Sequence, residues 1–143
     1  MKYLLSVVIL AVTLSGCGEK NRYKADLRDM DVEITIKRLE KALFQLDADS
    51  IHNMIPYLNQ QYGDFYELYN RNVINIGASN SRNYPANLQA FLNDYDMNRV
   101  YEKVMEVFPD VRDIKKKLTK GFRLYAHYFP EKKIPAVYTF LGG

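Results

Sequence analysis

Few residue types in this chain could carry out chemistry, and their spacing argues against most of it. The only imidazoles are His52 and His127, which do not stand in a metal-binding spacing, whereas a catalytic zinc ion needs three protein ligands and an open position. The sequence has neither a glycine-rich phosphate loop nor a serine nucleophile elbow. We therefore predict no catalytic residue, no metal site and no cofactor, and we interpret His127 as a helix-terminus or packing residue.

Two carboxylate pairs have a spacing that general acid–base catalysis could use. They are Asp64 with Glu67 and Asp94 with Asp96, but a carboxyl group needs a pocket that excludes water before its pKa suits that work. We interpret all four residues as helix caps and surface charge.

Cys17, the single cysteine, follows a sequence that is typical of export and lipid attachment. The apolar run from Tyr3 to Leu14 comes after one lysine, and it is shorter than the roughly 20 residues that a transmembrane helix needs. The next residues, Leu14-Ser15-Gly16-Cys17, match the bacterial lipobox: an aliphatic residue and two small ones before the cysteine that takes a thioether-linked lipid. We predict that residues 1–16 are a signal peptide and that Cys17 carries acyl chains such as palmitate. The alternative is an ordinary secretory signal with a chance cysteine.

The composition indicates which partners suit the chain. Once Lys2 is removed with the signal peptide, 19 of the 20 basic residues remain against 17 acidic ones, a surplus too small to attract nucleic acid. Several acyl chains bind a bilayer almost permanently, because each buried methylene contributes about 0.8 kcal/mol. The predicted partners are therefore membrane lipid, through acylated Cys17, and envelope proteins, but not nucleic acid.

The mature chain divides into a tether and one folded part. Residues 17–30 are polar and lack periodicity, which is typical of a linker. Over 31–37, apolar residues such as Val32 and Ile34 alternate with polar ones, which predicts a short strand with one buried face. We expect residues 31–143 to form a single, mostly helical domain. Its stability must come from a hydrophobic core, because one cysteine cannot form an internal disulfide.

Apolar residues at steps of three and four predict about five helices after this strand. The first begins near Leu39. In the second, Asp49-Ser50 offers an N-cap, and Pro56 fits only in the first turn or at a kink. A third helix should run from Asp64 to Ile76-Gly77.

Prolines and an aspartate mark the boundaries of the later helices. Pro85 suits the first turn of a short helix, and Pro109 ends the next one. Asp110 should cap the longest helix, which ends before Pro130. The apolar stripe of that helix consists of Val111, Ile114, Leu118, Phe122, Tyr125 and Phe129.

Two groups of side chains on these helices have more than one interpretation. The basic residues of the longest helix lie largely off its apolar stripe and predict a solvated face, with attraction to acidic lipid head groups as the alternative. The aromatic clusters predict core packing, with a peptide-binding surface as the alternative. These clusters are Tyr62-Phe65-Tyr66-Tyr69 and Phe122-Tyr125-Tyr128-Phe129.

A second strand completes the fold class. Residues 134–141 are rich in aromatic and β-branched residues, and we expect them to pair with residues 31–37. The prediction is a mainly α fold with a small β component (α+β). Because the chain ends close behind a strand with a bare edge, we also expect it to be the N-terminal part of a longer protein.

Four phrases of the sequence carry a family resemblance. They are residues 36–44 (IKRLEKALF), 62–69 (YGDFYELY), 74–77 (INIG) and 128–140 (YFPEKKIPAVYTF). Together they resemble the gliding-motility lipoprotein GldB family. The resemblance implies an envelope lipoprotein that is associated with the machinery for gliding and its linked secretion.

The chain is also distantly similar to predicted zinc-dependent proteases. Their His-Glu-x-x-His helix would come after residues 134–141, beyond the end of this sequence. The resemblance therefore carries over no catalytic residue, and Cys17 is the one functional position that matches.

We predict a membrane-anchored envelope lipoprotein with a structural or interaction role. The rival hypothesis is a truncated zinc-metalloprotease-like protein that has lost its catalytic half. For localisation we expect the outer membrane, with the domain facing the periplasm, because residue 18 is Gly and not the Asp that retains some lipoproteins at the inner membrane.

Overall fold

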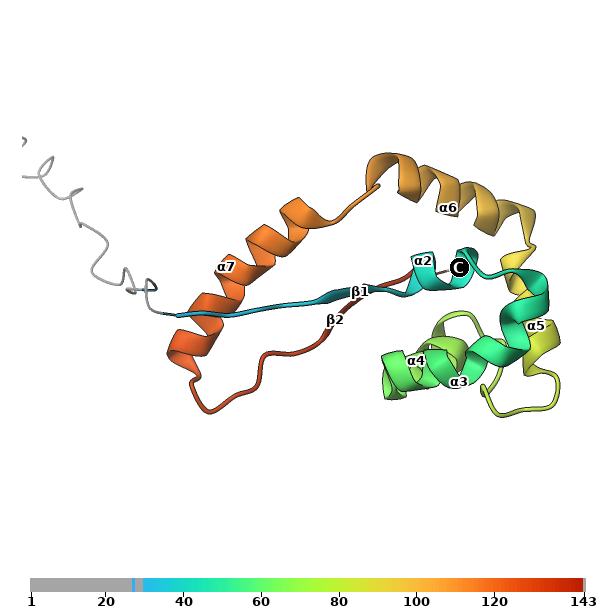
Figure 1. The fold of residues 1–143 in the computed structure, drawn as a ribbon, viewed down its shortest axis with the longest axis horizontal. Coiled ribbons are helices and arrows are strands. Elements are labelled where there is room, and N and C mark those ends of the chain that lie inside the picture. The colour runs from blue at the N-terminus through green and yellow to red at the C-terminus, as the bar shows by residue number, and fades with distance from the viewer. Residues whose placement is uncertain (1–26, 28–29, 143) are drawn as a thin grey trace, which may run out of the picture.

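The computed structural model describes Leu27 and residues 30–142, so the predicted signal peptide, Cys17 and most of the tether lie outside the described residues. Helices dominate the described chain and two short strands accompany them, which confirms the predicted fold class (Figure 1). The elements are β1 (Ile36–Arg38), α2 (Leu39–Phe44), the 3-10 turn η1 (Ala48–Ser50), α3 (Ile51–Tyr62), α4 (Asp64–Leu68), the π-helix η2 (Tyr69–Val73), α5 (Tyr84–Leu92), α6 (Tyr95–Val107), α7 (Arg112–Tyr128) and β2 (Val137–Thr139).

The two strands form a parallel pair, with Ile36 opposite Val137 and Arg38 opposite Thr139. The predicted pairing of the first and last strands is therefore confirmed. Each strand has only 3 residues, fewer than predicted, because Pro135 has no N–H and cannot extend the ladder.

The alternation before β1 is present although the ladder does not reach it. Ile34 is buried, while its neighbours Glu33 and Thr35 are exposed. The period-2 pattern thus predicted the buried side chain correctly and placed the strand too early.

Several helix boundaries follow the predicted signals. Pro85 lies in the first turn of α5, and α6 ends two residues before Pro109. Asp94 caps α6, since its carboxylate accepts the backbone N–H of Met97 at 2.9 Å. Its predicted capping role is therefore confirmed.

Two details of the helix starts differ from the prediction, and a third excludes one of its alternatives. Ser50 does not cap α3, because its hydroxyl donates to the Asp47 carbonyl at 2.7 Å and closes η1 instead. Pro56 lies in the middle of α3, which excludes the first-turn placement, while the alternative of a kink stays a prediction. Asp110 accepts the backbone N–H of Arg112 at 3.0 Å, but Val111 occupies the N-cap position because α7 begins one residue later than predicted.

The helix predicted from Asp64 to Ile76 is interrupted. After five residues α4 widens into η2, where the N–H of Ile74 bonds to the Tyr69 carbonyl at 3.1 Å. The chain then leaves the helix through Asn75 and Gly77, which have positive φ angles of 54° and 96°. In a π-helix each hydrogen bond joins residues that are five apart in the sequence. Tyr66, Tyr69 and Asn70, which lie around this turn, are all buried.

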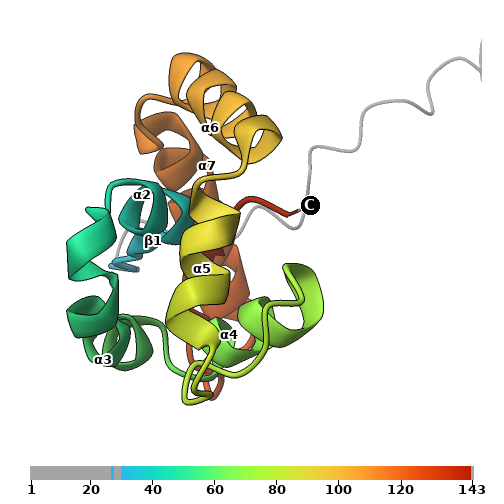
Figure 2. The same ribbon diagram turned by 90° about the vertical axis from the view of Figure 1, so that its right-hand side faces the viewer.

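The core lies within α2 to α5, and Figure 2 shows α6 above this group. No residue of α6 or α7 is buried, although both helices are amphipathic. None of the helices within the described part of the chain is long and apolar enough to cross a membrane. The buried core residues are Leu39, Leu43, Ile51, Leu58, Tyr62, Tyr66, Tyr69, Tyr84, Leu88 and Leu92.

Candidate functional site

A buried ion pair joins both strands to α2. Glu40 is 2% exposed, and its carboxylate accepts the Arg38 Nε–H and the Thr139 hydroxyl, each at 2.7 Å. Because a buried carboxylate is costly without such partners, the two bonds stabilise one arrangement of β1, α2 and β2. The sequence analysis did not single out Glu40, since its partner Thr139 is 99 residues away.

Arg38 also connects this junction to the link between α6 and α7. Its Nη1 donates to the Phe108 carbonyl at 2.9 Å and to the Pro109 carbonyl at 3.3 Å. The same guanidinium thus contacts both the strand pair and the α6–α7 link. Its role is structural, because the ion pair with Glu40 and these carbonyls satisfy most of its donors.

A groove of about 290 Å³ lies between β1 and the first turn of α7. The basic residues Lys41, Arg112 and Lys115 line it together with Arg38. Among the described residues, Asp110 is the one acidic residue in its lining, and its hydrogen bonds with Arg112 hold the pKa of its carboxyl below the usual value. The groove therefore favours an anionic group over a cation.

A second carboxylate, that of Glu67, fastens the loop after η2. It accepts the Ser79 backbone N–H at 3.1 Å and the Ser79 hydroxyl, and it pairs with Arg71 at 3.3 Å. Partial burial acts to raise the pKa of Glu67, but the hydrogen bonds from Ser79 and Arg71 outweigh it and lower that pKa. The Ser79 hydroxyl also bonds to Asn59 on α3.

This geometry argues against acid–base work by the Asp64 and Glu67 pair. Glu67 is committed to the loop, and Asp64 is exposed in the first turn of α4. The interpretation of Asp64 as surface charge is confirmed. Glu67, in contrast, binds Ser79 and holds the loop after η2 in place, a latch role that the sequence analysis did not predict. Its main partner, Ser79, is separated from it by the unpredicted π-turn.

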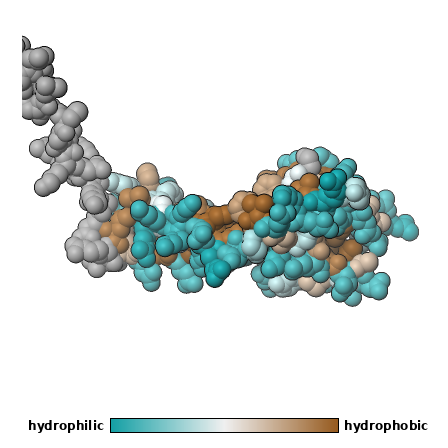
Figure 3. Space-filling model, turned by 90° about the horizontal axis from the view of Figure 1, so that it is seen from above, coloured by the Kyte–Doolittle hydropathy of each residue, from teal (hydrophilic) through white to brown (hydrophobic). Residues whose placement is uncertain are grey.

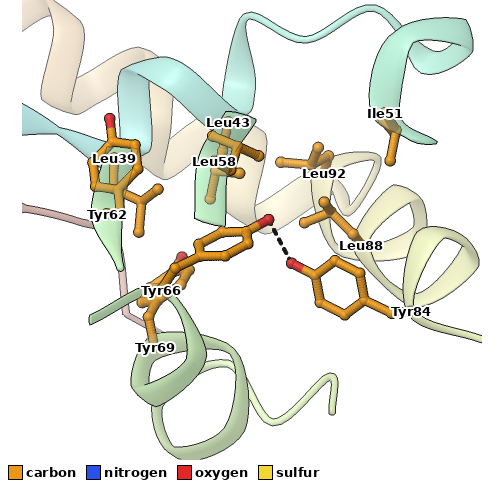
Figure 4. Packing of buried hydrophobic residues seen from close by; sticks show 10 residues of the cluster. All are labelled: Leu39, Leu43, Ile51, Leu58, Tyr62, Tyr66, Tyr69, Tyr84, Leu88 and Leu92. Atoms are coloured by element: carbon orange, nitrogen blue, oxygen red, sulfur yellow. Dashed lines mark hydrogen bonds between the residues drawn. The ribbon is translucent and has the colours of Figure 1, made fainter. Parts of the chain in front are cut away.

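The first aromatic cluster forms the centre of the core (Figure 4). The Tyr84 hydroxyl donates to the Tyr66 hydroxyl at 2.6 Å, and the Tyr69 hydroxyl donates to the Leu141 carbonyl at 2.9 Å. Burial raises the pKa of Tyr66 to about 12 and also raises that of Tyr84. These phenols therefore stay neutral near pH 7 and act as buried hydrogen-bonding groups, not as acids.

The second aromatic cluster lies on the C-terminal half of α7 and at Phe129, the residue after it, and its last two residues are exposed. Tyr128 and Phe129 are 56% and 48% exposed, and Phe122 and Tyr125 are partly buried. The core-packing interpretation is thus right for Tyr62 to Tyr69 and wrong for Tyr128 and Phe129.

The histidines lie apart from these groups. His52 is exposed on α3, beside the loop that contains Ser79, and His127 is exposed in the last turn of α7. The place of His127 in the last turn of α7 agrees with its predicted helix-terminus role. Within residues 30–142 and Leu27, no three His, Cys, Asp or Glu side chains are grouped to hold a metal ion.

A comparison with models of protein families identifies the family of this chain. A family model described as gliding motility protein GldB matches residues 20–143. The chain belongs to the GldB family. Comparisons with curated proteins and with solved structures found no match. The family match begins after Cys17, so acylation of that residue stays a prediction.

Three of the four phrases that resemble GldB meet at the junction described above. Residues 36–44 contain β1 and α2, and residues 128–140 contain β2. From residues 62–69, the Phe65 ring stacks on Tyr138 of β2 at a centroid distance of 4.5 Å. Figure 3 shows apolar surface between the two ends of the molecule. Phe140, which follows β2, is 45% exposed. Three of the four GldB-like phrases therefore contribute to one structural junction.

Proposed function

We propose that this GldB-family protein is an acylated envelope lipoprotein with a structural or interaction role in the gliding machinery. One observation carries the proposal: the family match at residues 20–143 stands directly behind the lipobox Leu14-Ser15-Gly16-Cys17. Acyl chains on Cys17 would hold the helical domain at a membrane, where envelope proteins are its partners.

The geometry of the described residues supports a structural role over a catalytic one. The two most constrained carboxylates, Glu40 and Glu67, are used to join strands, helices and a loop. In contrast, α6 and α7 bury none of their residues, and unburied amphipathic helices are typical of contact surfaces. Stoichiometric tight zinc in the purified chain would contradict this proposal and favour a metalloprotease-like protein.

The anchor is tested by labelling cells with radioactive palmitate. We expect Cys17→Ala to abolish labelling and to leave unprocessed precursor, because the lipid is attached to the cysteine sulfur. Ser15→Ala is the matched control, since it keeps a small residue in the lipobox and should be labelled and processed normally. Equal palmitate incorporation into wild type and Cys17→Ala would overturn the lipoprotein proposal.

We further propose that the protein resides in the outer membrane and faces the periplasm, because Gly18 follows the acylated residue. Membrane fractionation tests the first part, and protease treatment of intact cells tests the second. We expect recovery with the outer membrane and protection from added protease. Recovery with the inner membrane would contradict the localisation without affecting the acylation.

A further inference from the structure

The outward face of α7 combines exposed apolar side chains with exposed charge. Ile114, Lys117, Gly121, Leu124 and Tyr128 follow at steps of three and four, which places them on one face, and all five are exposed. The partly buried residues of the helix begin directly beside this face, because Leu118 lies one turn after Ile114; they are Leu118, Thr119, Phe122, Arg123, Tyr125 and Ala126. The helix thus leaves the apolar side chains of Ile114, Leu124 and Tyr128 exposed next to its partly covered face.

Positive charge surrounds this stripe. The sequence of α7 contains six Lys and Arg residues and a single acidic residue, Asp113. Lys116 and Lys120 lie beside Lys117 at the polar border of the outward face, and all three are exposed. A helix with aromatic and aliphatic residues on one side and lysines on the other is typical of an interfacial helix at an anionic membrane.

The position of α7 brings it within reach of a bilayer that holds Cys17. The first described residues lie at the same end of the long axis as α7 (Figure 1). From Cys17 to Met30 the chain has 13 steps, which span at most about 45 Å when fully extended. A second copy of the chain is a poor occupant for this face, because two such lysine-rich surfaces would repel each other.

We propose that α7 docks on the surface of a membrane that contains anionic phospholipids. Ile114, Leu124 and Tyr128 face the boundary between head groups and acyl chains, and the lysines face the lipid phosphates. This proposal rests on the proposed acyl anchor and deepens it, since it names a second contact between the domain and the bilayer. The groove with Lys41 and Arg112 continues the positive surface from the first turn of α7.

The experiment uses the full acylated chain in vesicles and a label at the centre of the stripe. Gly121→Cys suits this purpose because a Cβ at Gly121 meets no atom within 4 Å and acylated Cys17 offers no free thiol. A nitrobenzoxadiazole label at this site gains fluorescence when it leaves water. The same label at Asn80→Cys, in the exposed loop before α5, is the positional control.

We expect the emission of the Gly121→Cys label to rise at least roughly twofold when phosphatidylglycerol replaces 30% of the phosphatidylcholine, and to fall again in high salt. The triple charge reversal Lys116→Glu, Lys117→Glu and Lys120→Glu should remove the rise. The matched triple reversal Arg82→Glu, Arg99→Glu and Lys103→Glu changes the net charge equally outside α7 and should retain it. Far-UV circular dichroism verifies that both triple variants keep their helices.

Each other outcome decides against one proposal. Equal emission in neutral and anionic vesicles, or an undiminished rise in the α7 triple variant, would overturn membrane docking. A rise that needs no anionic lipid and grows with protein density would assign the face to a second copy and overturn it as well. Flotation with neutral vesicles tests the acyl anchor separately, and a chain that fails to float refutes the anchor. The emission of the label in anionic vesicles tests the docking of α7 independently.

Discussion

The lobe formed by α2 to α5 and the arm formed by α6 and α7 have similar sequence patterns and opposite degrees of burial. Both show apolar residues at helical spacing, but every residue of the buried cluster belongs to the lobe. α7 is the longest helix among the described residues and has the most regular stripe, yet it has no buried residue. Amphipathic periodicity therefore indicates that a face must be covered, and it does not indicate by what.

The largest expected effect comes from removing a core leucine of the lobe. Leu58 is fully buried, so Leu58→Ala should lower the free energy of unfolding by about 3 kcal/mol through lost burial and an added cavity. Leu124→Ala on α7 is the matched control and should change it by less than about 0.5–1 kcal/mol. Urea unfolding followed by circular dichroism measures both, and equal losses would refute the contrast between lobe and arm.

The next effect concerns the buried junction. Glu40→Ala leaves Arg38 without its carboxylate in a site where Glu40 is 2% exposed, and this should cost about 3 kcal/mol of unfolding free energy. Glu106→Ala, which breaks an exposed pair with Lys103 on α6, should cost about 0.5 kcal/mol or less. If the two variants unfold at the same urea concentration, Glu40 does not hold the strands to α2.

A smaller effect appears at alkaline pH. The pKa of Tyr66 is raised from 10.0 to about 12 by burial, so the unfolded chain loses this proton at a lower pH than the folded chain. The stabilisation is complete below pH 10 and is lost as the pH rises to about 12, by up to about 2–3 kcal/mol. Tyr66→Phe should reduce the slope of this part of the stability profile, to which the buried Tyr84 also contributes, whereas Tyr128→Phe on the exposed face should leave the slope unchanged. A wild-type slope in Tyr66→Phe would show that other groups cause the alkaline loss.

The smallest effect is expected for the latch at Glu67. Its pKa is lowered in the folded protein, so its stabilisation is present above the pKa of the unfolded state and is lost as the pH falls through the folded value. We expect Glu67→Gln to cost less than about 1 kcal/mol at pH 7, because the pair with Arg71 is half exposed. The difference from wild type should shrink in unfolding experiments as the pH falls below the ordinary range of a glutamate carboxyl group, and a difference that stays constant on acidification would contradict the assignment.

The sequence predicted the elements that depend on local signals. Pro85 and Asp94 marked helix starts correctly, and the alternation around Ile34 identified its buried side. These signals act within a few residues, because caps and periodicity involve neighbouring backbone groups. The fold class follows from them.

Long-range partners account for what the sequence did not predict. The π-turn after Leu68 depends on how Tyr66 and Tyr69 fit the core, and the burial of Glu40 depends on Thr139. Neither contact leaves a local pattern. The openness of the cluster at Tyr128 and Phe129 was missed for the same reason, since periodicity is identical in covered and uncovered helices.

Amide hydrogen exchange of the full acylated chain in neutral phosphatidylcholine vesicles tests the contrast between lobe and arm most directly. The account predicts that amides of α3 and α5, such as those of Leu58 and Leu88, exchange only when the whole lobe unfolds. Amides in the middle of α7, such as that of Lys120, should exchange through local opening at least roughly 100-fold faster. Equal protection of α7 and the lobe would contradict the account, because it would show that the apolar face of α7 is already covered.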